Sequence, residues 1–168
     1  MERRPATAEE AKALANPLRL RILRLCLHQP ITNKELAEAL GREPGALLHH
    51  VRTLQRTGFL DVAEVRTGRR GAVEKPYRAT GKSWTLDIGS DHKGAGTLAM
   101  LEAFRAEIHE AGPEGVVLSS RFALRLTPER AAQFQQQLSA LIDDYVALED
   151  PEGERYGAFV GLHRAGRP

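Results

Sequence analysis

Apolar residues recur at helical spacing between residues 32 and 54, in a pattern typical of two short helices joined by a tight turn. Thr32 and Glu35 form an S/T-x-x-E capping box, which predicts that a helix begins at Asn33. Gly41 can end this helix, because glycine adopts the left-handed backbone conformation without strain. Pro44 suits the first turn of the next helix, where its missing N–H costs least. Each helix has one apolar stripe at helical spacing: Leu36, Ala37 and Leu40 in the first, and Leu47, Val51 and Leu54 in the second.

Two such helices, crossing closely at the small Ala37, are typical of a helix-turn-helix. In that motif the second helix lies in the major groove of DNA. A helical hairpin inside an ordinary core has the same periodicity, so the motif alone leaves both interpretations open.

A β-hairpin is predicted directly after the motif. Residues 59–67 are rich in strand formers, residues 68–71 (GRRG) supply a turn, and residues 72–79 return. The turn carries Arg69 and Arg70, with Arg66, Lys75 and Arg78 close to it. A hairpin tipped with two arginines, directly after a helix-turn-helix, favours a wing that contacts DNA; a solvated hairpin with scattered charge is the alternative.

Residues 10–80 resemble the winged helix-turn-helix domain of bacterial ArsR-type transcriptional regulators. The resemblance implies a homodimer that binds double-stranded DNA at an inverted repeat, and we expect a repressor. Leu48 stands where the family often has a serine, which removes or moves one DNA contact. No thiol lies between Leu36 and Glu38, where the metal-sensing members have theirs. The matching pieces are Ala15-Asn16-Pro17-Leu18-Arg19, Ile22-Leu23, Glu35-Leu36-Ala37, His50-Val51, Leu54 and Gly58-Phe59-Leu60.

The residues expected to face DNA lie at the start of the first motif helix, off the apolar stripe of the second, and along the wing. Gly45 would let the backbone of the second helix approach DNA closely, and Arg52 and Arg56 are long enough to reach phosphates. Adjacent histidines on a helix point about 100° apart, so His49 and His50 fit hydrogen bonding better than chelation. The full set is Thr32, Asn33, Lys34, Gly45, Ala46, His49, His50, Arg52, Arg56, Arg66, Arg69, Arg70 and Lys75.

Two further helices are predicted before the motif. Thr7 caps the first, over residues 8–14, with Glu9 and Glu10 in its first turn. Pro17 begins the second, which we expect to run until Gln29-Pro30. We expect the single cysteine, on this second helix, to be a packed core residue and not a redox sensor.

Charge is unevenly divided along the chain. Residues 1–84 hold 16 Lys and Arg against 9 Asp and Glu, whereas residues 85–168 hold 8 against 13. The basic half is therefore the part suited to a polyanion, and the acidic half should point away from it. A single cysteine excludes an intramolecular disulfide. With no long apolar run and no apolar N-terminal segment, we expect a cytoplasmic protein without a membrane span.

The second half of the chain is expected to begin with a linker. We divide the chain into a DNA-binding domain at 1–84, a Gly- and Ser-rich linker at 85–96, and a dimerisation or effector-sensing domain at 97–168. A helix is predicted from Thr97 to Ala111. By resemblance to the ArsR family it pairs two subunits, and packing within one chain is the alternative. Its apolar stripe is Leu98, Leu101, Phe104 and Ile108.

A strand–helix–strand module is predicted to follow. Residues 116–126 and 156–162 alternate as strands do, and a helix begins at Thr127-Pro128-Glu129. The expected fold class is therefore mainly α with α+β features. Since two strands cannot cover a helix stably alone, they must join other strands or a second subunit. The module either only oligomerises or also encloses an unidentified small-molecule effector, with Arg121, Arg125, Tyr145 and His163 as its polar candidates.

Other kinds of site find little support in the sequence. A metal site could be assembled from residues such as Asp87, His92, His109 and His163, but their spacing does not fit, so no metal or other cofactor is predicted. The chain has no Gly-rich phosphate loop and no nucleophile elbow, so we do not predict an enzyme. The alternatives to a DNA-binding regulator are a winged-helix protein-interaction module and a small-molecule-binding protein without DNA affinity.

Overall fold

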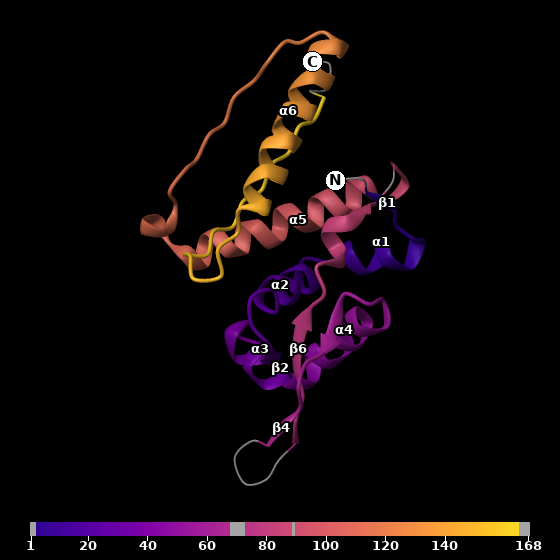
Figure 1. Cartoon of the computed structure of the whole chain (residues 1–168), viewed down its shortest axis with the longest axis vertical. Coiled ribbons are helices and arrows are strands. Elements are labelled where there is room, and N and C mark those ends of the chain that lie inside the picture. Colours follow the sequence, from indigo (N-terminus) through magenta and orange to yellow (C-terminus); the bar gives the residue numbers. More distant parts are fainter. Residues whose placement is uncertain (1–2, 68–72, 89, 165–168) are drawn as a thin grey trace. The chain divides into compact units, whose positions relative to one another are not determined.

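The computed structural model describes residues 3–67, 73–88 and 90–164 (Figure 1). Its fold is mainly α-helical with small β-sheets, as the sequence predicts. The contacts divide it into two compact units, one reaching to Arg105 and the other beginning at Ala106. Within the described residues, no helix is both long enough and apolar enough to cross a membrane.

Four helices form the body of the first unit, each begun by a residue that suits that position. Thr7 and Thr32 form complete capping boxes with Glu10 and Glu35, and Asn16 accepts a hydrogen bond from the backbone N–H of Arg19. The helices are α1 (Ala8–Leu14), α2 (Pro17–Leu25), α3 (Asn33–Ala39) and α4 (Pro44–Arg56). The predicted starts of these four helices are thus confirmed.

Helix α2 ends earlier than predicted. It stops at Leu25, with Cys26 as its C-cap, and does not continue to Gln29-Pro30. The carbonyl oxygen of Cys26 accepts a hydrogen bond from the N–H of Ala79 at 2.9 Å. A strand distant in sequence therefore uses a carbonyl at the helix end, which local periodicity does not reveal.

A three-stranded antiparallel sheet and a separate hairpin follow the helices. The sheet has the order β2 (Ile31–Thr32), β6 (Pro76–Ala79) and β3 (Leu60–Val62), and the hairpin is β4 (Arg66–Thr67) with β5 (Val73–Glu74). The single strand predicted over residues 59–67 is thus interrupted at residues 63–65. Strand β2 was not predicted, since a two-residue strand is too short to show an alternating pattern.

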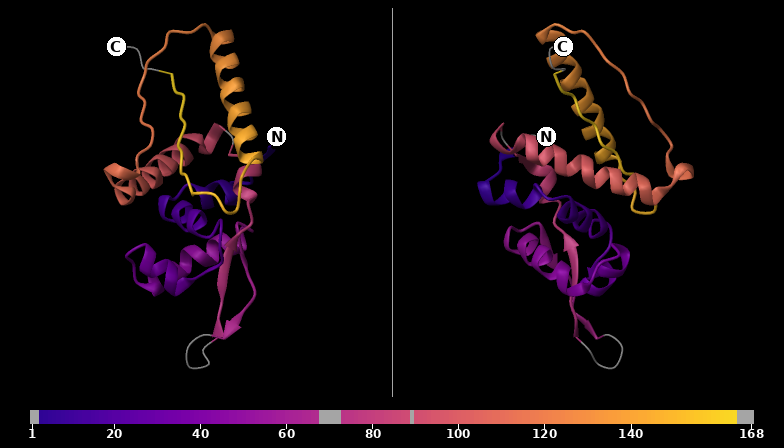
Figure 2. Two further views of the ribbon diagram at one scale, coloured as in Figure 1. Left: turned by 60° about the vertical axis from the view of Figure 1, so that its left-hand side comes forward. Right: turned by 180° about the vertical axis from the view of Figure 1, so that it is seen from behind.

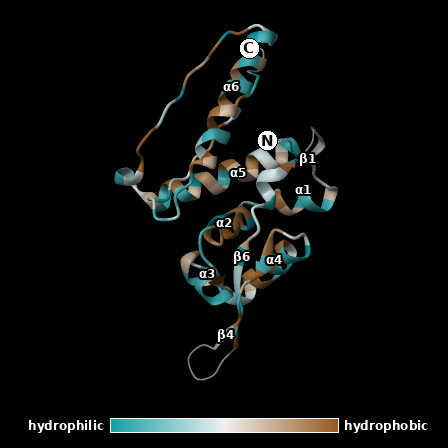
Figure 3. Ribbon diagram, viewed as in Figure 1, coloured by the Kyte–Doolittle hydropathy of each residue, from teal (hydrophilic) through white to brown (hydrophobic). Residues whose placement is uncertain are grey.

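The core of the first unit lies where α2, α3 and α4 meet. Ile22, Leu36, Leu47 and Val51 are fully buried, which confirms the two apolar stripes of the motif. Figure 3 shows hydrophobic stretches along α2, α3 and α4. Cys26 is fully buried too, as predicted. Burial raises the pKa of its thiol to about 12, because the thiolate would lose its hydration. The thiol therefore stays protonated and has no access to solvent oxidants.

Most of residues 85–96, predicted as a linker, lie in regular secondary structure. The 3₁₀ helix η2 (Lys82–Thr85) leads into β7 (Leu86–Asp87), which pairs in parallel with β1 (Arg4–Pro5). Helix α5 (Ser90–Ala111) then begins seven residues before the predicted Thr97. A Cβ on Gly96 would meet Ile88 at 3.3 Å, so the absent side chain lets the helix approach this residue. Tertiary packing outweighs the low helix propensity of Gly94 and Gly96.

The second unit contains one long helix. After the 3₁₀ turn η3 (Pro113–Gly115), α6 (Pro128–Ala147) begins beyond its N-cap Thr127, as predicted. Residues 116–126 and 156–162, predicted as strands, are extended but form no β-ladder among the described residues (Figure 2). A strand needs a hydrogen-bonded neighbour, and the described chain supplies none here.

Candidate nucleic-acid interface

The turn between α3 and α4 is fixed by local hydrogen bonds. Gly41 has φ +60°, and the N–H groups of Gly41 and Arg42 donate to the carbonyls of Glu38 and Ala37 at 3.2 and 2.9 Å. This pair of bonds is a Schellman motif, which satisfies carbonyls left over at the end of α3. The side-chain amide of Asn33 also donates to the carbonyl of Pro44 at 2.9 Å. The start of α3 is therefore tied to the start of α4.

Helix α4 has sharply different faces. Leu47, Val51 and Leu54 have no exposed surface. A helix turns about 100° per residue, so positions 45, 49, 52 and 56 fall on one line on the side opposite these three. Gly45, His49, Arg52 and Arg56 are all exposed there, with Ala46 beside them near the helix start. We call the residues Gly45, His49 and Arg52 the exposed stripe of α4.

His50 lies between the two faces. It is half-buried, and its Nδ1 is buried without a hydrogen-bond partner among the described residues. Its pKa is lowered, chiefly by burial and further by the nearby charges of Arg19 and His49. At neutral pH His50 is therefore an uncharged imidazole that is turned partly towards the core, and it is less suited to a phosphate than His49.

Some of the other predicted contacts are engaged inside the protein. The Thr32 hydroxyl is buried and is used in the cap of α3, where it accepts from the N–H of Glu35. The guanidinium of Arg56 pairs with the carboxylate of Glu9 at 2.9 Å, although both side chains are largely exposed. Lys34 and Lys75 are exposed.

The wing is described only in part. Arg66 lies opposite Glu74 in the β4–β5 ladder, and Thr67 lies opposite Val73. The two arginines predicted at the tip, Arg69 and Arg70, lie outside the described residues.

A charge cluster behind α4 was not predicted from the sequence. The Glu10 carboxylate, nearly buried, pairs with Arg4 and with Lys82, both at 2.7 Å. Lys82 also donates to the carbonyl of Thr57, the C-cap of α4, and its ammonium lies 5.1 Å from the centre of the Phe59 ring. The sequence placed Glu10 in the first turn of α1, but nothing in it indicated Lys82 as the partner of this carboxylate. This lysine joins α1 to the end of α4.

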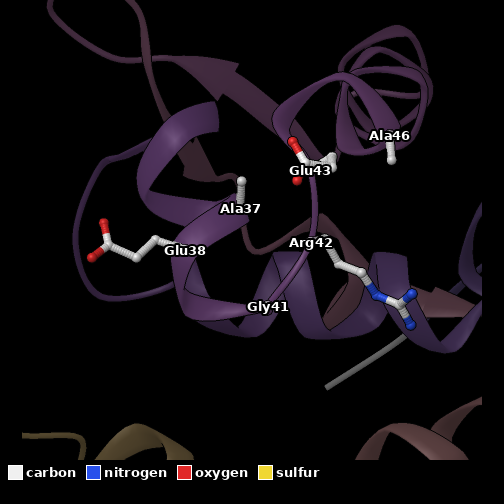
Figure 4. Close-up of a pocket in the computed structure, with 6 residues that line it drawn as sticks. All are labelled: Ala37, Glu38, Gly41, Arg42, Glu43 and Ala46. Carbon is white, nitrogen blue, oxygen red and sulfur yellow. The ribbon is translucent and has the colours of Figure 1, made fainter.

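A shallow hollow lies at the turn of the motif. Its lining includes Glu38, Arg42 and Glu43, all exposed. Figure 4 shows the side chains of Glu38 and Arg42 pointing away from each other. An open surface with mixed charges and no enclosed volume offers no basis for a small-molecule site.

Helix α5 has two different faces in its first part. Gly96, Ala99 and Ala103 are buried, whereas Leu98 and Leu101 on the other side are 64% and 43% exposed. Ile108 is 37% exposed and Phe104 is half-buried. The stripe predicted as a dimer interface is therefore largely uncovered in the single chain.

The predicted effector residues remain a prediction, since the structure shows only their exposure and hydrogen bonds. Arg121, Arg125, Tyr145 and His163 are all exposed, and no hydrogen bond among the described residues joins any two of them. Within the described part of the chain, no three His, Cys, Asp or Glu side chains form a metal-binding group.

Residues 14–63 match the family model of a helix-turn-helix domain. The matched segment runs from the end of α1 to just beyond β3 and includes the whole α3–turn–α4 motif. No curated protein sequence matches the chain.

Among solved structures, reduced HlyU from Vibrio cholerae N16961 is 24% identical, with a TM-score of 0.34 over 54% of this chain and 77% of that one. The C30AH42A mutant of ZitR from Lactococcus lactis is 19% identical, with a TM-score of 0.35 over 76% of this chain and 73% of that one. TM-scores this low establish no common overall fold.

Proposed function

We propose that this protein is a sequence-specific, DNA-binding transcriptional regulator of the ArsR type that acts as a repressor. The observation that carries the proposal is the exposed stripe of α4 on a helix whose opposite side is fully buried. Gly45 and Ala46 leave room for the helix start to enter a major groove, and His49 and Arg52 supply hydrogen-bond donors there. The match to a helix-turn-helix domain supports the same function.

The basic half of the chain supports a nucleic-acid partner. Lys34 and Lys75 are exposed and available for phosphates, and the sequence adds Arg66, Arg69 and Arg70 along the wing. We assign Thr32 and Asn33 a supporting role, since the first caps α3 and the second ties α3 to Pro44. Arg56 would reach a phosphate only by leaving Glu9, and an exposed ion pair of this kind is weak.

The proposed regulator is a homodimer. Leu98 and Leu101 on the predicted stripe of α5 are exposed, and these apolar side chains support pairing of two copies. In such a dimer two α4 helices would enter successive major grooves, with half-sites about 34–36 Å apart, so the operator would be an inverted repeat.

The experiment that tests the proposal is selection of duplexes from fragmented genomic DNA by the purified protein, followed by sequencing. Enrichment of an inverted repeat with the predicted half-site spacing would support a dimeric regulator. If only weak, salt-sensitive binding without enrichment is found, the proposal fails. That result would favour the alternative, a protein-interaction module whose binding surface is the acidic half of the chain.

A further inference from the structure

The segment 117–126 has an apolar face that nothing in the described chain covers. Leu118 is 81% exposed, Phe122 66% and Leu124 54%. Residues 117–126 also make no backbone hydrogen bond with any other segment of the described chain. Alternating apolar side chains and open backbone groups together are the features of a strand that lacks its neighbour.

The described part of the same chain offers no suitable neighbour. Residues 154–164 are the other extended segment of this unit, and no β-ladder joins the two (Figure 2). Antiparallel pairing, the more stable kind, is available from a second copy of segment 117–126 itself.

Among registers that keep the apolar side chains on one face, the one centred on Phe122 pairs the most residues without setting arginine against arginine. When two copies run antiparallel with Phe122 opposite Phe122, Leu118 lies opposite Leu126, and Ser120 lies opposite Leu124. On the other face Arg125 meets Ser119, and Arg121 meets Ala123. A shift that centres the pairing on Arg121 or on Ala123 sets arginine directly against arginine, which is unfavourable. A shift by one residue would place apolar side chains on the polar face.

Helix α6 offers the cover that a two-stranded ribbon needs. Leu141, Tyr145 and Leu148 follow one another at helical spacing and are 53%, 70% and 74% exposed. A helix of 20 residues spans about 30 Å, and ten extended residues span about 33 Å. The helix therefore matches the ribbon in length, and burying both apolar faces removes the instability of an isolated pair of strands.

We propose that residues 117–126 of two copies of this chain pair antiparallel about Phe122, forming an intermolecular β-ribbon whose apolar face packs on α6. The inference rests on the proposed homodimer and adds a second interface to the one on α5. It also explains why this unit is uncovered in the single chain, since its β-partner belongs to another molecule.

Disulfide trapping in the full-length protein tests this register. The only natural thiol, on Cys26, is fully buried. The wild-type chain should therefore form no intermolecular disulfide and serves as the negative control. After mild oxidation with copper–phenanthroline, Phe122→Cys should give covalent dimers. Leu118→Cys alone should not, because its two copies would lie about 27 Å apart.

A second pair of variants leaves the apolar face intact. Chains carrying Ser119→Cys and chains carrying Arg125→Cys, with tags of different size, are co-expressed and oxidised together. A mixed covalent dimer should form, and neither variant should link to itself.

The outcomes separate this inference from the proposed function. If light scattering shows a dimer that binds its operator but none of these links forms, the ribbon is wrong and the regulator stands. Equal linking at Leu118 and Phe122 overturns the register. A mass of one chain overturns the ribbon and the proposed homodimer together.

Discussion

Arg52 and His49 carry the donors on the exposed stripe of α4. If Arg52 reads a base, Arg52→Ala should weaken operator binding by about 1–3 kcal/mol and relax specificity at one position of each half-site. Fluorescence anisotropy with operator variants changed at single positions measures both effects. Arg130→Ala removes the same charge from an exposed site on α6 and is the matched control. Equal losses in the two variants would contradict the assignment of Arg52.

Glu10 is the residue on which the charge cluster behind α4 depends. Its pKa lies well below the usual range, first because Arg4 donates to the carboxylate, and then because Lys82 and the N–H of Thr7 do so. A carboxyl whose pKa is depressed on folding contributes stability above its ordinary pKa of about 4.3, and this contribution is lost as the pH falls below that value.

Replacing Glu10 with glutamine should therefore destabilise the protein in a pH-dependent way. We expect Glu10→Gln to lower the free energy of unfolding by about 1–3 kcal/mol at pH 7, and the difference from wild type to shrink below about pH 4. Urea unfolding at several pH values measures this. Glu9→Gln, at the exposed pair with Arg56, should cost less than about 1 kcal/mol at pH 7. A constant difference down to pH 3 would rule out the ionised carboxylate as the cause.

At the scale of elements, two glycines of the motif should respond in opposite directions to alanine. Gly41 has φ +60°, so Gly41→Ala should destabilise the protein by about 1–2 kcal/mol even though a Cβ there meets no atom within 4 Å. Gly45 is helical and equally open, so Gly45→Ala should stabilise the protein by about 0.5–1 kcal/mol. Denaturant unfolding of the pair gives both signs.

Operator affinity adds a second readout to this pair. If α4 approaches DNA closely at Gly45, Gly45→Ala should lower the affinity even though it raises stability. An unchanged affinity in a stabilised Gly45→Ala variant would mean that the start of α4 does not enter the groove.

At the scale of the whole molecule, dimerisation through α5 should determine whether one protein dimer binds both half-sites of the operator at once. Leu98→Glu with Leu101→Glu would place charges in the proposed α5 interface. Because a two-stranded ribbon alone holds two chains only weakly, light scattering should show the mass fall towards 18.5 kDa from twice that value. Operator affinity should fall roughly 100-fold or more, since each chain would then bind one half-site alone. Ala95→Glu adds a charge to an exposed part of the same helix away from the stripe, and should leave both quantities unchanged.

The sequence by itself determined the helix-turn-helix and its boundaries. Thr32, Glu35, Gly41 and Pro44 act within one turn of the helix ends that they define, and the apolar stripes follow from a period of 3.6 residues. The same local rules located α1 and α6. Much of the candidate interface was predictable for this reason, since the exposed stripe of α4 is what remains once the buried stripe is assigned.

Only the tertiary structure decided which polar groups are occupied within the protein. Arg56 meets Glu9, 47 positions earlier, and Lys82 meets Glu10 and Thr57. The early start of α5, the end of α2 and the strands β1, β2 and β7 likewise depend on partners distant in sequence. Segment 117–126 shows what happens when such a distant partner is missing. Its alternating pattern predicts a strand, but a strand forms only where a second edge supplies the hydrogen bonds.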